Sequence, residues 1–444
     1  MTPREFAVSV VRRLRDHGYQ ALFAGGCVRD ELLNRVPKDY DIATDARPEE
    51  VQKLFRRTVT VGMSFGVMKV MGPRGDNEKW LEVEVATFRN DVGYSDGRHP
   101  DAVEFSTAQE DALRRDFTIN GMFFDPLENR LIDFVGGQED LAARRLRAIG
   151  EPAARFGEDK LRLLRGVRMA TRFDFHIEGA TLTAMQEMAE QITVVSAERI
   201  AEELRQLLVH PRRAAGMNLL HDVGLVGPVM PELLPMRALP YGRPDAPTGN
   251  LWDHVMQVLE LLGPDVSFPL ALAALLHDVG KPRCIGRGPD RYTFHNHEHI
   301  GRRMAGEIAL RLKLSNVERE RLEWLVEKHQ ILCDARQMRT AKLKTLLAHP
   351  GIHELLALHR ADSTAAGKCT DHVDYCDSLL VEWSAADLNP PALLTGHDLQ
   401  RRGFQPGPHF KVVLDALRDG QLDGTIKSLE QAWDLVNRLS PPPK

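Results

Sequence analysis

The sequence predicts a multidomain α+β protein in which an α/β head with a mixed sheet precedes an all-helical neck, a further helical domain and a tail. The chain has 444 residues, more than one hydrophobic core accommodates. Segments with the two-residue alternation of strands end near residue 134, and helical periodicity follows. Three prolines and two glycines between 236 and 250 indicate a linker. We expect domains at 1–145, 146–235, 236–385 and 386–444.

The composition is typical of a soluble protein. Hydrophobic residues make up 43% and charged residues 27% of the chain, and no stretch of about 18 uncharged apolar residues occurs. The N-terminal segment lacks an apolar signal core, so we expect a cytoplasmic protein without membrane association. The net charge of −5 argues against indiscriminate coating of nucleic acid. Five cysteines without metal-ligand spacing predict free, buried thiols and no disulfides. The oligomeric state is not indicated.

The first predicted strand of the head ends in two glycines. Residues 3–17 are predicted as an amphipathic helix and 21–24 as a strand. Gly25 and Gly26 follow, and because they lack side chains they let backbone N–H groups approach a phosphate chain. The next helix adds its positive N-terminal end and carries Arg29 near its start. We interpret this segment as a triphosphate-binding turn, although a glycine pair before a helix is also common as a simple turn.

Two aspartates follow at a spacing of two. Residues 40–44 combine aromatic and β-branched side chains and are predicted as a strand, so Asp39 and Asp41 project from the same face. Carboxylates at this spacing suit Mg²⁺, and a pair of such ions can clamp the attacking and leaving oxygens of a phosphoryl transfer. The structural alternative is a solvated turn at the end of a strand.

The next head elements bring further polar groups toward these acids. A helix is predicted to begin at Pro48, because proline suits the first helical turn, and strands are predicted at 67–71 and 81–88. Glu84 on the second of these strands is either a third acid beside the metal or an ordinary residue of an edge strand. Residues 89–100 are rich in glycine and polar side chains and predict a mobile loop.

A second polar motif, Arg-Arg-Asp-Phe-Thr-Ile-Asn, occupies residues 114–120. Adjacent arginines bind phosphate oxygens by forked hydrogen bonds, and an aspartate accepts hydrogen bonds from ribose hydroxyls. An ion pair between Arg115 and Asp116 is the structural alternative. A hairpin of 122–124 with 131–134 completes the predicted sheet.

The neck begins with a predicted helix that is apolar on one side and basic on the other. Glu158 and Asp159 stand four and three residues before Arg162, so all three can share one face. Surface salt bridges would explain this spacing equally well. From 144 to 172 nine basic residues stand against three acidic ones, and an RNA backbone is expected there. A solvated basic helix face is the alternative.

Together these motifs resemble the signature of the class II tRNA nucleotidyltransferases and their relatives, the bacterial poly(A) polymerases. The matching stretches are Gly-Gly-Cys-Val-Arg-Asp at 25–30, Lys-Asp-Tyr-Asp-Ile-Ala-Thr at 38–44 and the 114–120 motif. The resemblance implies a nucleotidyltransferase head with catalytic, Mg²⁺-binding Asp39 and Asp41, and with ATP and CTP as substrates. It also implies that the Glu-Asp-x-x-Arg motif at 158–162 selects the base. The residues implied to contact the nucleotide are Gly25, Gly26, Arg29, Arg115, Asp116, Asn120, Glu158, Asp159, Arg162 and Arg165.

The activity implied by this resemblance is template-independent addition of CMP and AMP to the tRNA 3′ end, with release of pyrophosphate. Members that add only A, only CC or a poly(A) tail are alternatives. In CCA-adding members a flexible loop at the position of 89–100 helps the site switch between C and A, which weighs against a CC-only enzyme. The serine-capped helix from Ser196 matches the family's Glu-Arg-x-x-x-Glu motif and is interpreted as structural. His221-Asp-Val-Gly224 is interpreted as a helix end.

The region beyond the predicted linker contains histidines and aspartates in the order His254, His277, Asp278, His297, His329 and Asp362. Imidazoles and carboxylates bind divalent metals such as Ni²⁺, Mn²⁺ or Co²⁺, whereas any single histidine is more often structural. The ordered set resembles the HD phosphohydrolase superfamily. By this resemblance His254, His277, Asp278 and Asp362 hold one metal, and His297 and His329 are available for a second. His299 lies two positions past the matching histidine.

An HD phosphohydrolase activity is the second function that the resemblance implies. The competing reading is an HD phosphohydrolase whose head is inactive and serves only to bind RNA. The helical tail from 386 resembles the tails of HD-containing nucleotidyltransferases.

Overall fold

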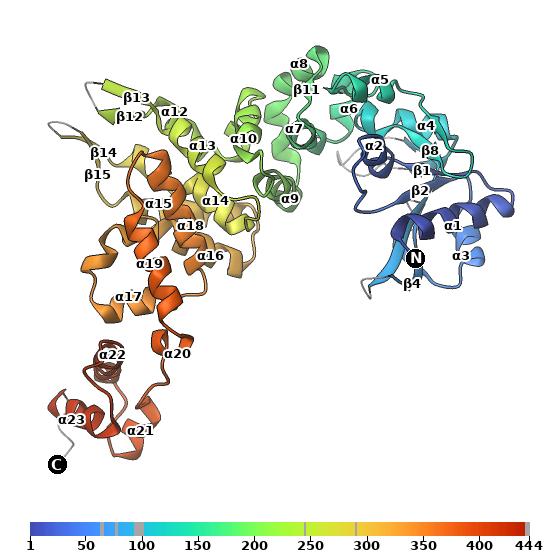
Figure 1. The fold of residues 1–444 in the computed structure, drawn as a ribbon. Coiled ribbons are helices and arrows are strands. Elements are labelled where there is room, and N and C mark those ends of the chain that lie inside the picture. Colours follow the sequence, from blue (N-terminus) through green and yellow to red (C-terminus); the bar gives the residue numbers. More distant parts are fainter. Residues whose placement is uncertain (63–65, 76–78, 93–101, 244–245, 289–290, 440–444) are drawn as a thin grey trace. The chain divides into compact units, whose positions relative to one another are not determined.

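The computed structural model describes all residues except 63–65, 76–78, 93–101, 244–245, 289–290 and 440–444. The described chain forms two compact units, Met1–Pro231 and Glu232–Lys444 (Figure 1). The first unit contains a mixed sheet followed by helices, and the second is mainly helical. The predicted multidomain α+β fold class is therefore confirmed.

A mixed sheet forms the centre of the head. Within the described residues it has seven strands in the order β3-β4-β5-β2-β1-β8-β9. Neighbours are antiparallel except β2 and β5, which run parallel with Asp41 opposite Glu84. The strands are β1 (Ala21–Ala24), β2 (Asp41–Thr44), β3 (Thr58–Gly62), β4 (Val67–Arg74), β5 (Trp80–Thr87), β8 (Phe123–Asp125) and β9 (Arg130–Ile132), and β6 (Arg89–Val92) pairs separately with β7 (Ala102–Phe105).

Strand alternation leaves one face of the sheet open for the site. In β5 the residues alternate between buried and exposed, which places Glu84 on the open face. Helix α1 (Pro3–Asp16) packs on the opposite face, where a Cβ at Gly72 of β4 would lie 2.6 Å from the Phe6 ring. The glycine therefore permits this close approach. The other head helices are α2 (Gly26–Leu32), α3 (Pro48–Leu54), α4 (Ala108–Leu113) and α5 (Gly137–Ala142).

Helices make up most of the rest of the first unit: α6 (Pro152–Glu158), α7 (Leu161–Phe173), α8 (Gly179–Glu187), α9 (Ala197–Leu208), α10 (Arg213–Asp222) and α11 (Val226–Val229). Helix α7 packs against α9 and α10. The neck is not entirely helical, because β10 (Arg145–Leu146) and β11 (His176–Ile177) form a short parallel ladder. Helix α10 ends beside Gly224, which has a φ of 87°, so 221–224 is a helix end as interpreted.

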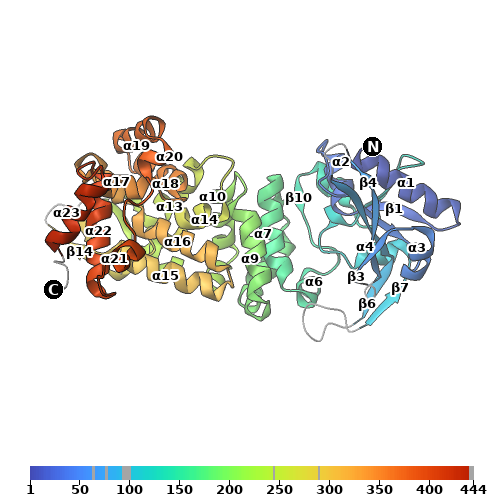
Figure 2. The same ribbon diagram turned by 90° about the horizontal axis from the view of Figure 1, so that it is seen from below.

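The second unit surrounds α13 (Leu251–Leu261), α14 (Phe268–Leu276) and α18 (Ile352–Ala365), which pack against one another. The other helices are α12 (Leu234–Ala238), α15 (His297–Arg311), α16 (Asn316–Lys328), α17 (Thr340–Leu347), α19 (Asp371–Glu382), α20 (Ala385–Leu388), α21 (Gly396–Arg401), α22 (Pro408–Leu422) and α23 (Leu429–Leu439). In the tail, α22 and α23 lie side by side (Figure 2) and share a small core with Leu399.

Two expectations for this unit are wrong. The proline-rich stretch 236–250 is not a linker, because β12 (Pro240–Arg243) and β13 (Ala246–Asn250) pair as an antiparallel hairpin ahead of α13. Prolines are tolerated in a hairpin whose strands have a free edge. A second hairpin joins β14 (Ile285–Arg287) to β15 (Tyr292–Phe294). The five cysteines are all free, as expected, but Cys333 and Cys369 are exposed rather than buried.

Candidate functional sites

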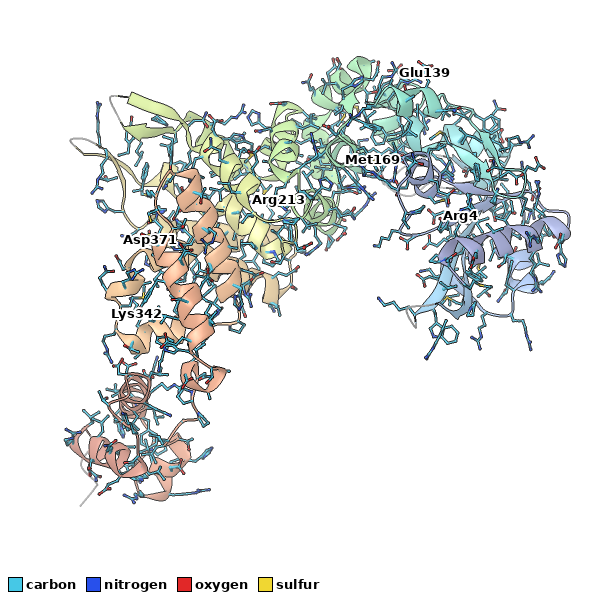
Figure 3. The ribbon with its side chains drawn as sticks, viewed as in Figure 1. Arg4, Glu139, Met169, Arg213, Lys342 and Asp371 are labelled. Atoms are coloured by element: carbon cyan, nitrogen blue, oxygen red, sulfur yellow. The ribbon has the colours of Figure 1, made fainter. Side chains whose placement is uncertain are left out.

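A cavity of about 630 Å³ lies in the first unit between the open face of the head sheet and helix α7. Ten of its thirteen lining residues are predicted site residues. The cavity is lined by Gly25, Gly26, Arg29, Asp41, Glu84, Arg114, Arg115, Asp116, Asn120, Asp159, Arg162, Arg165 and Met169, the last of which is labelled in Figure 3. Asp39 and Glu158, also predicted, are not among the lining residues.

The glycine turn sets one wall of this cavity. Gly25 has a φ of 71°, and a Cβ at this position would lie 2.9 Å from Arg115 Nη1. Both the backbone conformation and the space therefore require glycine. Arg29 is buried, where it donates to Asp30 at 2.7 and 2.9 Å and to Asn120 Oδ1 at 2.5 Å. Arg29 thus holds Asn120 in place and does not point freely into the cavity.

The acidic side of the cavity is formed by Asp41 and Glu84. Asp41 and Glu84 face each other across the parallel β2–β5 ladder, and Lys69 lies 3.8 Å from Glu84. The Asp41 side chain is exposed to the cavity, with protein atoms around it. Partial desolvation by these atoms, with repulsion by Glu84 and Asp39, raises the pKa of Asp41 to about 6. A divalent cation with oxygen ligands would relieve this repulsion, so the residues fit Mg²⁺.

The Arg-Arg-Asp motif is held by a residue that the sequence did not single out. Buried Asp111 accepts from Arg114 at 2.6 Å and from Arg115 at 2.9 Å. Burial opposes its ionisation, but the two arginines hold the pKa of Asp111 below its ordinary value. The alternative ion pair between Arg115 and Asp116 does not form, because Asp116 lies 2.9 Å from Arg165 of α7 instead.

Both carboxylate oxygens of Asp116 have partners in the cavity wall. Its Oδ1 accepts from Asn120 Nδ2 at 3.0 Å, and its buried Oδ2 lies 2.9 Å from Arg165 Nη2. Burial opposes its ionisation, but Arg165 and these hydrogen bonds hold the pKa of Asp116 below its ordinary value. Asp116 therefore lines the cavity as a carboxylate, a form that accepts hydrogen bonds.

The predicted base-selecting residues form two separate ion pairs. Glu158 accepts from Arg162 at 2.5 Å and from Arg155 at 2.8 Å. Asp159 instead accepts from both terminal nitrogens of Arg199 on α9, at 2.7 and 3.2 Å. Asp159 and Arg162 therefore both line the cavity, but each is oriented by a different partner. Arg199 belongs to the neck motif interpreted as structural, and no local sequence pattern links it to Asp159 forty positions earlier.

In the second unit, three predicted ligands lie on one side of Asp278, which is itself a predicted ligand. Its Oδ2 lies 3.3 Å from His277 Nε2 and 4.0 Å from His254 Nε2. His254 Nε2 is also 3.0 Å from Asp362 Oδ1. Nitrogen and carboxylate ligand atoms of His254, His277 and Asp362 lie within 4.8 Å of one another, which is close enough to share one ion.

The other carboxylate oxygen of Asp278 faces a second group. Its Oδ1 lies 3.4 Å from His297 Nε2 and 3.5 Å from His329 Nε2, and these two nitrogens are 3.3 Å apart. Asp278 thus stands between two ligand groups and offers one oxygen to each. Burial disfavours its charged form, but Lys281 and His277 hold the pKa of Asp278 well below its ordinary value. It is therefore a carboxylate at neutral pH.

Backbone hydrogen bonds fix the tautomer of three of the histidines. Each donates Nδ1–H to the carbonyl three residues earlier, which leaves Nε2 unprotonated toward the group. The pairs are His277 with Ala274 (2.8 Å), His297 with Phe294 (2.8 Å) and His329 with Val326 (2.7 Å). A backbone carbonyl bound to the ring nitrogen that faces away from the metal is typical of metal-binding histidines. Within the described chain His277 Nε2 and Asp278 Oδ1 are buried without hydrogen-bond partners, so the set fits one or two transition-metal ions.

A third cluster of residues with metal-binding side chains does not have the free ligand atoms of a metal site. Cys333, His359 and His372 have ligand atoms within 4.8 Å of one another. His359 Nε2, however, accepts the N–H of Leu332 at 3.2 Å, so the ring proton is on Nδ1, 3.2 Å from His372 Nε2. Burial lowers the pKa of His359 to about 3, so it carries one proton only. These residues form a hydrogen-bonded pair of histidines rather than a metal centre. His299 also lies outside the HD group, with its side chain 62% exposed.

Three family models match the chain. The "Poly A polymerase head domain" covers 21–147, "Probable RNA and SrmB- binding site of polymerase A" covers 174–236, and "HD domain" covers 251–378. The chain is 42% identical over 221 residues to the CCA-adding enzyme of Lactococcus lactis subsp. cremoris (strain MG1363), which covers 49% of this chain and 54% of the relative. It is 42% identical over 218 residues to the CCA-adding enzyme of Enterococcus faecalis (strain ATCC 700802 / V583), covering 48% and 52%.

The crystal structure of Bacillus stearothermophilus CCA-adding enzyme in complex with CTP matches with a TM-score of 0.71 and 25% identity, over 99% of this chain and 98% of that one. The chain therefore contains a poly(A) polymerase head domain, the associated RNA-binding region and an HD domain. At the sequence level the chain spans about half the length of the curated relatives that it matches. A Thermotoga maritima CCA-adding enzyme complexed with tRNA shares the fold, with a TM-score of 0.60 and 19% identity.

The family models coincide with the two sites. The head model contains the glycine turn and both aspartates, and the HD model contains all six predicted ligands of the second unit. Among the residues that the structure describes, no helix is both long enough and apolar enough to span a bilayer.

Proposed function

We propose that this protein is a CCA-adding enzyme that transfers CMP and AMP from CTP and ATP to the 3′-hydroxyl of tRNA. The observation that carries the proposal is the 630 Å³ cavity, which brings acids, arginines and the Asp159 and Arg162 pair to one place. The matching family structures are described in complexes with CTP, ATP and tRNA. In this proposal 1–145 supplies catalysis, 146–235 base and RNA contacts, 236–385 an HD activity and 386–444 a tail.

The acidic wall of the cavity would hold the catalytic metal. Asp39 and Asp41 are the proposed Mg²⁺ ligands, with Glu84 beside them. Bound Mg²⁺ lowers the pKa of an attacking hydroxyl and neutralises charge on a triphosphate. Arg115, fixed by Asp111, directs its positive charge at the phosphate chain. Together these residues align the triphosphate between the glycine turn and the acids.

Asp159 and Arg162 are proposed to select the base. Cytosine and adenine both present an amino donor beside a ring-nitrogen acceptor, which complements one carboxylate and one guanidinium. Uracil and guanine reverse this order and would leave buried polar groups unpaired at roughly 1–3 kcal/mol each. The contacts of Arg199 with Asp159 and of Glu158 with Arg162 would hold both readers in position.

The nearest competing functions are those of related enzymes that add only A, only CC or a poly(A) tail. The predicted switching loop is 89–100, and its residues 93–100 lie outside the described residues. Incubation of tRNA transcripts ending in the discriminator base, in C and in CC, with CTP and ATP separately and together, distinguishes them at single-nucleotide resolution. We expect C, C and A to be added in order and extension to stop there. Continued A addition, or arrest after CC with both nucleotides present, would contradict the proposal.

A phosphohydrolase activity of the HD region is the second proposed function. The observation that favours it is the pair of ligand groups on Asp278, with three tautomers fixed for metal binding. Imidazole-rich sets favour Ni²⁺, Mn²⁺ or Co²⁺ over Mg²⁺. We expect hydrolysis of phosphate esters such as 2′,3′-cyclic ends of damaged tRNA when such a metal is present. Absence of bound metal and of hydrolysis with any of the three ions would make the group structural.

A further inference from the structure

The four histidines of the HD group are not all held in the same way. His277, His297 and His329 are each fixed by a backbone carbonyl three residues earlier. His254 Nδ1, by contrast, is buried with no hydrogen-bond partner in the described part of the chain. Without a contact at Nδ1, the ring is held by the hydrogen bond between Nε2 and Asp362, itself a predicted ligand, and by the packing around the ring.

That packing comes from the hairpin in the stretch predicted to be a linker. The ring of Tyr241 in β12 stacks on the His254 ring, with centroids 4.4 Å apart and planes inclined by 11°. His254 Nε2, at the ring edge, lies 3.0 Å from Asp362. Lys281 Nζ, which pairs with Asp278, is 5.9 Å from the Tyr241 ring. One aromatic side chain thus contacts the His254 ring and approaches the lysine beside the shared carboxylate.

We propose that Tyr241 is a positioning residue that completes the ligand group formed by His254, His277 and Asp362. The stack restricts rotation of the His254 ring and keeps Nε2 directed at Asp362, which a backbone hydrogen bond does for the other three histidines. The group on the opposite side of Asp278 does not depend on the hairpin, because both of its imidazoles are fixed by their own backbone. The two groups therefore differ in what assembles them.

This inference rests on the proposed HD metal centre, and its test measures binding rather than hydrolysis. The full chain carrying Asp39→Asn and Asp41→Asn, so that the head takes up no divalent ion, is titrated with Co²⁺ by visible absorption and calorimetry. We expect two Co²⁺ ions per chain. Tyr241→Leu, which keeps apolar bulk and loses the aromatic face, should weaken one of them by about 10–100-fold and leave the other unchanged. Tyr241→Phe should bind both ions like the parent chain.

Tyr292→Leu, in the second hairpin, is the matched control and should bind both ions normally. The role of Tyr241 would be overturned by unchanged binding in Tyr241→Leu, by weakened binding in Tyr241→Phe, or by equal weakening of both ions. A Tyr241→Leu chain that unfolds would weaken both ions and lower its thermal midpoint, which also counts against the proposal. If the parent chain binds no Co²⁺ at all, the HD metal centre itself is refuted before any substitution at Tyr241 is made.

Discussion

Among the described carboxylates, Asp41 has surroundings that strongly disfavour ionisation, because Glu84 and Asp39 add negative charge to a partly desolvated position. Substitution of Asp41 or Asp39 by alanine should abolish nucleotide addition and leave tRNA affinity within several-fold, since the proposed RNA contacts lie in the neck. Primer extension and filter binding measure the two effects. Glu82→Ala, on the same face of β5 but paired with Lys69 and outside the cavity, is the control and should remain active.

The same carboxylate predicts a stability effect that depends on pH. The folded pKa of about 6 is above the ordinary value of 3.8, so ionised Asp41 disfavours the folded state. Asp41→Asn should therefore raise Tm without divalent ions above pH 6. The gain should shrink as pH falls from 6 toward 4 and vanish below it, as calorimetry across this range would show. A gain that is constant with pH, or one that Glu82→Gln reproduces, would contradict this explanation.

Base selection gives a prediction for three side chains that act together. Asp159→Ala and Arg162→Ala should lower incorporation of CTP and ATP and relax rejection of UTP and GTP. With two mismatches of roughly 1–3 kcal/mol each, the selectivity at stake is on the order of a hundredfold or more. Arg199→Ala should relax selectivity as well, because Asp159 loses its bidentate partner. Ratios of kcat/KM for the four nucleotides are the measurement, and unchanged ratios in all three variants would refute base reading by these residues.

At the scale of elements, the turn between β1 and α2 requires glycine at position 25 for two reasons, the backbone conformation and the close contact with Arg115, and substitutions can separate them. Gly25→Ala should lower stability by about 1–3 kcal/mol, because its backbone, with a φ of 71° and a ψ of −126°, is strained for any residue with a Cβ, and the change should also displace Arg115 and lower kcat/KM. Gly18→Ala is a matched control, since Gly18 has a φ of 88° with nothing within 4 Å of the added Cβ. It should lose similar stability and keep activity. Equal activity of the two variants would show that the contact with Arg115 is unimportant.

Elements were predictable where their periodicity was local. The alternation along β5 was sufficient to place Glu84 on an exposed face, and the serine and glycine signals located helix ends such as that at Gly224. The hairpin at 240–250 was missed because its prolines and glycines dominate the local signal, whereas pairing and the contact between Tyr241 and His254 stabilise it. The composition of this stretch is typical of a linker, but tertiary contacts fold it into a hairpin.

For the whole molecule, we predict that the two activities are separable. The described residues place the cavity in the first unit and the HD ligands in the second. His277→Ala or Asp278→Ala should lose phosphate-ester hydrolysis and keep nucleotide addition at the parental rate. His353→Ala, an exposed histidine of the same unit, should keep both. Parallel primer-extension and hydrolysis assays decide the question, and loss of addition in either ligand variant would show that the sites are coupled.

The residues of the candidate sites could be predicted where they belong to a motif that is recognisable along the chain. The glycines, the aspartate pair and the ordered histidines met this condition. Asp111 stands three and four positions before Arg114 and Arg115, a helical spacing that could have marked it. Arg199 and Tyr241 could not be found in this way, because each holds a motif residue that is thirteen to forty positions away. No spacing rule marks such a distant partner, since it depends on which helix or hairpin the fold brings alongside.

The double contact of Asp159 with Arg199 has a consequence for how this sequence changes over evolution. A substitution at either position leaves the other charged side chain without its ion-pair partner beside the cavity. We therefore expect lineages that remain viable to change both residues together or to keep both. Aligned homologues should accordingly show correlated changes at these two positions, although one lies before α7 and the other on α9. For the same reason, an engineer who wants a polymerase with a new nucleotide alphabet would have to randomise 159, 162 and 199 in a single library.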